Sequence, residues 1–212
     1  MPLAKPDLIK TRTCADAFGQ IFFAFIFFLD LRVGGVRVRV DLLPDVIGWI
    51  MVASALGRIF DLHTEIPKLR TLAFILVFLS LFDLVQFRIR LSSHVFIQST
   101  FPFKAIVTAL DVLFFWRLCG VIMDMAAAVR NALIYERADM RRILYVVALI
   151  AAFILVGISV AFPPFATIAL LVGIPLSLIA FFLMMGLMHG VRNMCLGKPV
   201  YSIGERVDNP RL

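Results

Sequence analysis

Charged residues are scarce in this sequence: they occupy 17% of its 212 positions, with 14 acidic residues against 21 basic ones. A soluble domain has about 25% charged residues and about 45–50% apolar residues. Here hydrophobic residues reach 62%, and the mean hydropathy is +0.99. The apolar residues come in blocks of bilayer length. The shortage of charge therefore argues against a soluble domain and favours an α-helical membrane protein.

Residues that bind metals or carry out nucleophilic catalysis are also few. The three cysteines form no CxxC pair, and the three histidines are scattered along the chain. The sequence contains no HExxH metal motif, no GxSxG elbow and no P-loop. We therefore expect no cofactor, no metal site and no catalytic residue, and the sequence favours no enzyme class.

Two further signals are missing. The net charge is +7, yet no run of five or more basic residues occurs, and the basic residues lie at the ends of apolar runs. That distribution is typical of membrane anchors and does not predict nucleic-acid binding. Residues 1–16 lack the pattern of a cleaved signal peptide. We expect the first apolar run to be retained as a helix.

Apolar runs predict six membrane-spanning helices, each close to the roughly 20 residues that cross a bilayer. They would form three helical hairpins in an all-α membrane domain covering residues 15–190. A cytoplasmic segment, 1–14, would precede this domain, and a cytoplasmic tail, 191–212, would follow it. The predicted spans are 15–33, 44–60, 71–87, 105–125, 143–162 and 166–190.

Basic residues predict the orientation of these spans. With six spans, fourteen Lys and Arg fall on the side of the two termini, six fall on the other side, and Arg117 lies within a span. The positive-inside rule then places both termini in the cytoplasm.

Two segments on the predicted outer side alternate apolar and basic residues. Residues 36–41 read Val-Arg-Val-Arg-Val-Asp, and 87–91 read Phe-Arg-Ile-Arg-Leu. Alternation with a period of two is typical of a strand with one apolar face. The two segments would satisfy each other's backbone groups as a short outer β-ribbon cap. Alternatively, Gly34-Gly35 would turn residues 31–33 back onto 36–40 as a local hairpin.

The fourth predicted span contains three charged residues: Asp111, Arg117 and Asp124. Arg117 and Asp124 share a helix face, whereas Asp111 is rotated about a third of a turn away from Arg117. An arginine at mid-membrane costs at least about 2.5–3.5 kcal/mol and faces protein or water. Arg117 would either form an ion pair that locks the bundle, with Asp111, Asp83 or Asp30 as its partner, or bind a substrate or ion in a polar cavity.

Polar residues also follow one face of the first and third predicted spans. Asp30 closes a stripe that begins at Asp16, and Asp83 lies between Ser80 and Gln86 at three-residue steps. These residues would either line a central path together with the fourth span or mark helix ends in the interface. Separately, Pro44 and Asp45 are typical of a helix start, with Trp49 expected in the outer aromatic belt.

The segment from Asp30-Leu-Arg through Val40-Asp-Leu-Leu-Pro-Asp-Val-Ile-Gly-Trp-Ile50 resembles one in uncharacterised small bacterial multi-pass membrane proteins. Those proteins carry a D-x-R, then Gly, then a D-x-L-P-D-x-I-G-aromatic motif between their first two helices. This chain has extra Arg-Val alternation after Gly35. The resemblance covers about thirty residues and implies a location in the bacterial cytoplasmic (inner) membrane. It implies no activity.

Two functions fit these observations. In the first, the protein is a small transporter or permease-like protein, and a substrate or ion path is lined by Asp30, Asp83, Asp111, Arg117 and Asp124. In the second, it is a non-catalytic membrane assembly or interaction protein, whose outer cap binds a partner or anionic lipid through Arg37, Arg39, Arg88 and Arg90. In both, the bilayer surrounds the chain, with a homo-oligomer or a membrane partner expected and no nucleic acid.

Overall fold

A computed structural model of the chain describes residues 6–28, 32–34, 38–41, 45–81, 85–90, 96–98 and 101–198. The described residues form seven α-helices, three 3-10 helices and four strands. The helices are α1 (Pro6–Ile9), α2 (Arg12–Ala24), η1 (Phe25–Phe28), α3 (Asp45–Arg58), η2 (Phe60–Leu62), α4 (Ile66–Leu81), α5 (Phe101–Ala128), α6 (Ala132–Ala161), η3 (Pro163–Phe165) and α7 (Ala166–Cys195). The strands are β1 (Arg32–Gly34), β2 (Val38–Asp41), β3 (Val85–Arg90) and β4 (Phe96–Gln98).

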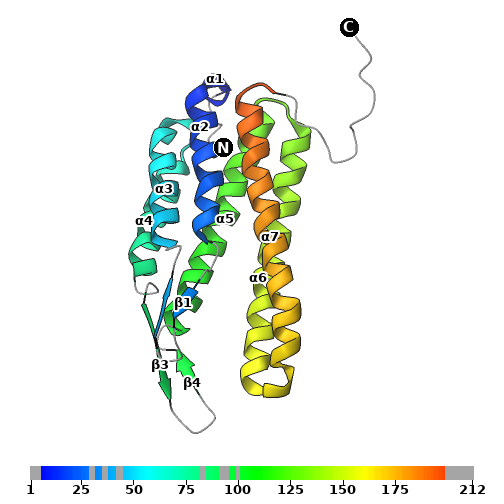
Figure 1. Ribbon diagram of the computed structural model, residues 1–212. Coiled ribbons are helices and arrows are strands. Elements are labelled where there is room, and N and C mark those ends of the chain that lie inside the picture. The colour runs from blue at the N-terminus through cyan, green and yellow to red at the C-terminus, as the bar shows by residue number, and fades with distance from the viewer. Residues whose placement is uncertain are drawn as a thin grey trace.

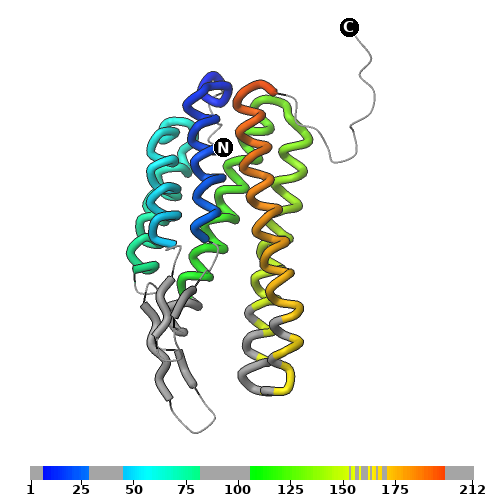
Figure 2. The backbone as a smooth tube through the Cα atoms, in the orientation of Figure 1, coloured from blue at the N-terminus to red at the C-terminus, as the bar shows by residue number. Residues whose placement is uncertain are grey.

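The six long helices form a closed ring. Each helix from α2 to α6 packs on the next one in the chain, and α7 packs back on α2 (Figure 1). Consecutive helices run in opposite directions, as three helical hairpins require. The tube in Figure 2 shows the start of α2 and the end of α7 at the same end of the molecule. This arrangement agrees with the predicted helical fold class.

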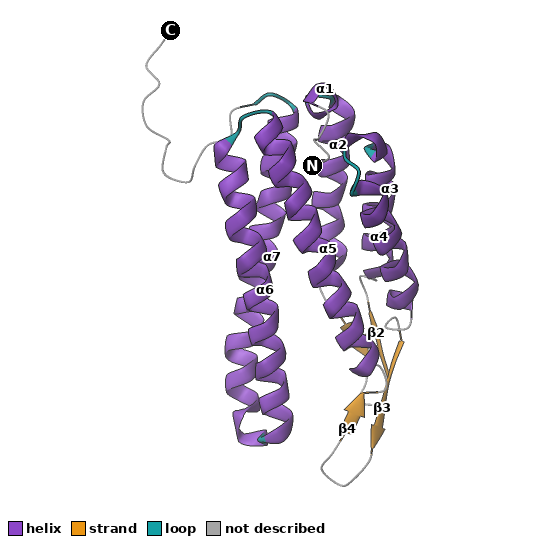
Figure 3. Ribbon diagram, turned by 180° about the vertical axis from the view of Figure 1, so that it is seen from behind, coloured by secondary structure: helices purple, strands orange, loops and turns teal. Residues whose placement is uncertain are grey.

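The four strands form one antiparallel sheet at the other end of the molecule, with the order β1-β2-β3-β4 (Figure 3). The register places Val38 opposite Phe87 and Val40 opposite Val85. The ribbon expected between 36–41 and 87–91 is therefore present in part: β2 pairs with residues 85–87, whereas residues 88–90 pair with β4. β1 also pairs with β2, with Gly34 opposite Arg39, so the local hairpin occurs as well. Strand β4 has no counterpart in the sequence prediction.

Several predicted span boundaries are wrong. The third predicted span, 71–87, begins within α4 and runs into β3, because alternating residues at 85–90 favour a strand over a helix. The first, 15–33, ends inside β1 for the same reason. Helix α6 begins eleven residues before the predicted 143, where Asn131 accepts a hydrogen bond from the backbone N–H of Ile134 and caps the helix.

Two described helices are long and apolar enough to cross a membrane by length and composition. They are Ile106–Ala128 within α5 and Leu171–Cys195 within α7. Helices α2, α3 and α4 have 13, 14 and 16 residues. Such helices are only about 20–24 Å long, below the roughly 30 Å of a hydrocarbon core. The structure thus provides two candidate spans among the described residues.

Candidate functional site: a cavity inside the helical ring

A cavity of about 200 Å³ lies among η1, α3, α5, α6 and α7. Its polar lining consists of two carboxyl groups, one phenol and one hydroxyl. None of the described residues that line it is basic. The lining residues are Phe25, Phe28, Asp45, Trp49, Val107, Asp111, Phe115, Tyr145, Leu149, Ser177 and Phe181.

Helical spacing explains why these residues converge. Residues four apart lie one turn above each other on a helix. Asp45 and Trp49 form such a pair on α3, Asp111 and Phe115 on α5, and Ser177 and Phe181 on α7. Helices α3, α5 and α7 therefore each present one polar and one aromatic side chain to the cavity.

Asp111 is the best-defined polar group of the cavity. Tyr145 Oη on α6 donates a hydrogen bond of 2.9 Å to Asp111 Oδ2 on α5, which joins the two helices across the cavity wall. Ser177 Oγ donates to the carbonyl oxygen of Gly173, one turn earlier on α7, at 2.9 Å. The carboxyl group of Asp111 thus receives a hydrogen bond from a buried phenol.

The aromatic lining is continuous. Phe28 lies 4.8 Å from Trp49 between ring centroids, and Phe25 lies 5.3 Å from both Phe115 and Phe181. Phe115 in turn lies 5.1 Å from Tyr145. Tilted and edge-to-face contacts at these distances are favourable for aromatic pairs. The rings therefore support one another and give the cavity a defined shape.

Trp49 corrects the expectation of an outer aromatic belt. Only 3% of this side chain is exposed, and it packs on Phe28, Phe114 and Phe115. The neighbouring Gly48 makes this packing feasible. A Cβ there would lie 2.6 Å from Phe28 Cε1 and 3.1 Å from the carbonyl oxygen of Ala24. The Asp45–Trp49 segment is thus part of the cavity wall as well as a helix start.

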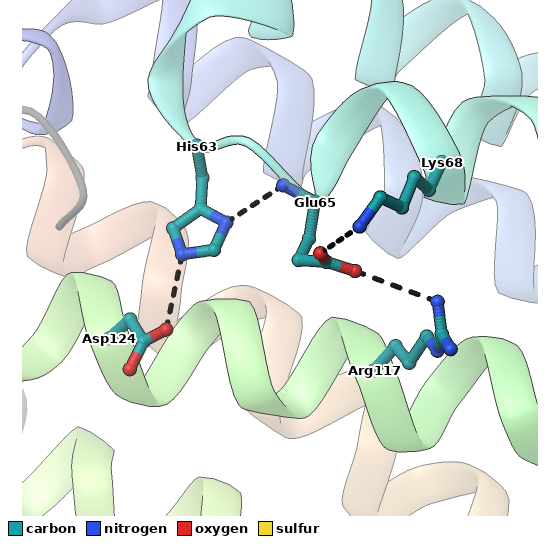
Figure 4. Close-up of polar contacts among 5 residues, drawn as sticks. All are labelled: His63, Glu65, Lys68, Arg117 and Asp124. Carbon is teal, nitrogen blue, oxygen red and sulfur yellow. Dashed lines mark hydrogen bonds and ion pairs between the residues drawn. The ribbon is translucent and has the colours of Figure 1, made fainter. Parts of the chain in front are cut away.

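Arg117 lies outside the cavity and has a different partner from those expected. Its Nη1 atom lies 3.6 Å from Glu65 Oε2, and 47% of the side chain is exposed. Glu65 also accepts a 2.6 Å hydrogen bond from Lys68 Nζ (Figure 4). The hydrogen bond from Lys68, with Arg117 and His63 nearby, holds the pKa of Glu65 below its ordinary value. Arg117 therefore joins α5 to the connection between α3 and α4.

Asp124 contacts the same connection through His63. The backbone N–H of Glu65 donates to His63 Nδ1 at 3.1 Å, and His63 Nε2 lies 3.1 Å from Asp124 Oδ2 (Figure 4). Because Nδ1 accepts a hydrogen bond, Nε2 carries the ring proton and donates to Asp124. Arg117 and Asp124, expected on one face of the helix, thus both contact residues of the 63–65 segment.

Three of the remaining candidate residues lie in strands. Arg39 lies in β2, and Arg88 and Arg90 lie in β3, where Arg88 pairs with Gln98 and Arg90 with Phe96. Asp30, Asp83 and Arg37 lie outside the described residues. Of the five residues predicted to line a path, the structure brings Asp111 to the cavity and places Arg117 and Asp124 elsewhere.

Sequence reasoning missed most of the cavity. The sequence pattern predicts only a helix start at Asp45 and gives no role to Tyr145 or Ser177, and it does not indicate Glu65 as the partner of Arg117. A usable signal existed for Tyr145 and Ser177, since each is a polar residue within a predicted apolar span.

No known protein family matches the chain, and comparison with curated proteins and with solved structures finds no similar protein.

Proposed function

We propose that the chain is a small multi-pass protein of a bacterial cytoplasmic membrane that acts as a permease-like solute carrier. The observation that carries the proposal is the partly open cavity between α3, α5, α6 and α7, which Asp45 and Asp111 help to line. Acidic residues at membrane depth are costly and typically mark a substrate or ion path. In this proposal six helices span the bilayer and both termini are cytoplasmic.

Exposed apolar side chains support insertion in a bilayer. From residue 143 onward on α6, the described exposed residues recur at helical spacing and are isoleucine, leucine or valine: Ile143, Leu144, Val147, Ile150, Ile154 and Ile158. Helix α7 exposes Leu171, Val172 and Phe182, and α4 exposes Phe74 and Phe78. Soluble monomers rarely expose contiguous apolar surface on this scale. The acyl chains of a bilayer would cover these exposed apolar faces.

The arrangement of basic residues supports the orientation. The helix connections near Arg58, Lys68 and Arg130 lie at the end of the molecule that contains α1 and the end of α7 (Figure 1). The opposite end contains the sheet and the apolar α6–α7 turn. The positive-inside rule places the first end in the cytoplasm. The resemblance of the 30–50 segment to bacterial multi-pass proteins also supports this location.

Water access to the cavity tests the proposal. In a Ser177→Cys variant lacking the three native cysteines, a membrane-impermeant maleimide should label the new thiol in membrane vesicles. Ser80→Cys is the matched control, since Ser80 is buried on α4 and does not line the cavity. If the maleimide labels neither variant, that result contradicts a solute path. It would favour the second function, an assembly or interaction protein acting through Arg37, Arg39, Arg88 and Arg90.

A further inference from the structure

Three arginines in the described part of the chain lie against a glycine of the helix that packs beside their own. Each pair joins two long helices: α2 with α7, α3 with α4, and α6 with α7. A Cβ built on the glycine would lie 3.3–3.4 Å from a nitrogen of the guanidinium group. The missing side chain therefore leaves the space that the arginine occupies. The three Gly–Arg pairs are Gly19 with Arg192, Gly57 with Arg70, and Gly186 with Arg141.

The guanidinium groups of these pairs are partly buried and have no anionic partner. Arg70 Nε, Arg141 Nη1 and Arg192 Nε are buried and make no hydrogen bond. Among the described residues, no carboxylate forms an ion pair with any of the three. An arginine cannot lose its proton in a protein, and a buried charge without a partner is costly. An anion from outside the chain would offset that cost.

Neighbouring arginines show a different arrangement. Arg117 forms an ion pair with Glu65, and Arg142 forms one with Asp139. Arg142 also lies over the ring of Trp116, 4.7 Å from its centroid. The chain thus supplies carboxylates for these two arginines and none for the arginines of the Gly–Arg pairs.

The Gly–Arg pairs lie toward the end of the molecule that the proposed orientation places in the cytoplasm. Arg192 is in the last turn of α7, and Arg70 is near the start of α4. Arg141 directly precedes the predicted span 143–162. In a bilayer these positions correspond to the inner membrane interface, where phospholipid headgroups lie. The cytoplasmic leaflet contains anionic lipids that attract Lys and Arg.

Exposed apolar side chains continue from each pair toward the opposite end of the molecule. They recur on the paired helices at spacings of three or four residues, which keeps them on the same helix faces. A phospholipid would place its phosphate at the arginine and its acyl chains along these side chains. An inorganic phosphate ion would use the arginine alone. The exposed residues are Phe23 on α2, Phe74 and Phe78 on α4, Leu144 on α6, and Phe182 on α7.

We propose that the three Gly–Arg pairs bind anionic phospholipids of the inner leaflet, with Arg70, Arg141 and Arg192 each donating to one phosphate group. The planar guanidinium group presents parallel N–H donors that match two phosphate oxygens. An anionic headgroup such as phosphatidylglycerol balances the charge of one arginine. A zwitterionic headgroup adds an ammonium group that the arginine repels. This inference is independent of the cavity and goes beyond the carrier function.

Lipid titration tests the proposal. Native mass spectrometry of the detergent-solubilised protein should show saturable binding of phosphatidylglycerol, and the thermal unfolding midpoint should rise with occupancy. Phosphatidylethanolamine at the same concentration should bind more weakly, and sodium phosphate should not raise the midpoint. An equal rise with sodium phosphate would assign the sites to the free ion and overturn the lipid assignment. Equal binding of phosphatidylethanolamine would overturn the preference for an anionic lipid.

Substitution of the arginines tests the sites. Arg141→Gln should weaken phosphatidylglycerol binding about fivefold, the usual effect of one basic residue at an anionic membrane surface. Arg141→Lys keeps the charge and loses the planar fork, so it should weaken binding as well. Arg117→Gln is the matched control, because it removes the same charge from an arginine that already has Glu65 as its partner. Equal loss in Arg117→Gln and Arg141→Gln would attribute binding to net charge and overturn the proposal.

A triple variant, in which Arg70, Arg141 and Arg192 are all replaced by glutamine, separates lipid binding from folding. In detergent without added lipid, its unfolding midpoint should equal or exceed that of the unmodified protein, because three unpaired charges are removed. Phosphatidylglycerol should then raise the midpoint much less than in the unmodified protein. A lower midpoint without lipid would assign the arginines a structural role and contradict the proposal, as would an undiminished rise with phosphatidylglycerol.

Discussion

At the scale of single residues, the cavity depends on a few contacts between helices that follow one another in the chain. Tyr145 donates to Asp111 across α5 and α6, and Gly48 allows α3 to approach Phe28 and Ala24. Neither contact follows from local sequence pattern. Each can be removed by a small substitution with a matched control on the same type of element.

Tyr145→Phe should lower the thermal stability of the protein in detergent. The change removes the donor to Asp111 and leaves a carboxyl group in an apolar surrounding, at a cost of about 1–3 kcal/mol. Tyr135→Phe is the control, since Tyr135 lies on the same helix but is exposed. Thermal unfolding followed by circular dichroism measures both. Equal midpoints for the two variants would contradict a stabilising role for the Tyr145–Asp111 hydrogen bond.

Gly48→Ala should destabilise the fold by about 1–3 kcal/mol, the usual cost of overpacking. The new Cβ would lie 2.6 Å from Phe28 Cε1, so Phe28 would have to shift into the cavity wall. In the control, Gly120→Ala, a Cβ meets no atom within 4 Å. That variant should be neutral or stabilised by up to about 1 kcal/mol through helix propensity. The two unfolding midpoints should therefore move apart, and a shared midpoint would argue against the tight α3 contact.

At the scale of elements, polar contacts join helices near the end that contains α1. The α3–α4 connection contacts α5 through two links, His63 to Asp124 and Glu65 to Arg117. Helix α2 contacts α7 through Cys14 and Cys195, whose sulfur atoms lie 2.7 Å apart. These contacts hold the helices together at this end. At the other end, the helices lead into the sheet and the α6–α7 turn.

Acid should weaken the link between Glu65 and α5. The pKa of Glu65 is lowered in the folded protein, first by the hydrogen bond from Lys68. Its contribution to stability is therefore present above the ordinary Glu pKa of about 4.3 and is lost as the pH falls through the lower folded value. Glu65→Gln should reduce the decline of the unfolding midpoint between about pH 5 and about pH 3. Glu136→Gln, on the exposed surface of α6, should leave that decline unchanged. A decline identical in Glu65→Gln and the unmodified protein would contradict the prediction.

Oxidation should join α2 to α7. Copper phenanthroline accepts two electrons from the Cys14 and Cys195 thiols, two protons leave, and an S–S bond forms within one chain. Mass spectrometry of the intact protein should show the loss of two hydrogens and no dimer. Cys119→Ser should still cross-link, whereas Cys195→Ser should not. Failure of the Cys119→Ser variant to cross-link would argue against the contact between the first and last long helices.

At the scale of the whole molecule, one end is rich in basic residues and the other consists of strands and an apolar turn. Phe162 at the α6–α7 turn and Lys198 after α7 are both exposed and lie at opposite ends of the helix that joins them. A thiol at each position therefore reports on the side of the membrane that it faces. The proposed orientation predicts a different labelling result for each thiol.

In cells producing variants without native cysteines, Phe162→Cys should react with a membrane-impermeant maleimide added outside. Lys198→Cys should react only after the membrane is permeabilised. The positive-inside rule is the physical reason for this asymmetry. Reaction of Lys198→Cys in intact cells would reverse the orientation. Reaction of neither thiol after permeabilisation would contradict the exposure of both sites.

Local pattern was sufficient to predict some features of this protein and insufficient for others. The order of the helices follows from apolar runs, and the β2–β3 pairing follows from alternation at 36–41 and 87–91. The shared face of Arg117 and Asp124 follows from helical spacing. Their partners, Glu65 and His63, and the presence of Asp45 and Asp111 in the lining of one cavity depend on how each helix is rotated in the ring. One sequence contains no local signal for that rotation.

The closure of the ring by α2 and α7 has a consequence for biogenesis. Helix α2 is synthesised first among the long helices, and α7, its neighbour, is synthesised last. The α2 surface that contains Cys14 and Gly19 consequently has no α7 to cover it until the last helix has emerged from the ribosome. Gly19 is then approached by the side chain of Arg192, from the last turn of α7. Ribosomes stalled before α7 would hold an open five-helix intermediate, with a cavity that lacks one of its walls.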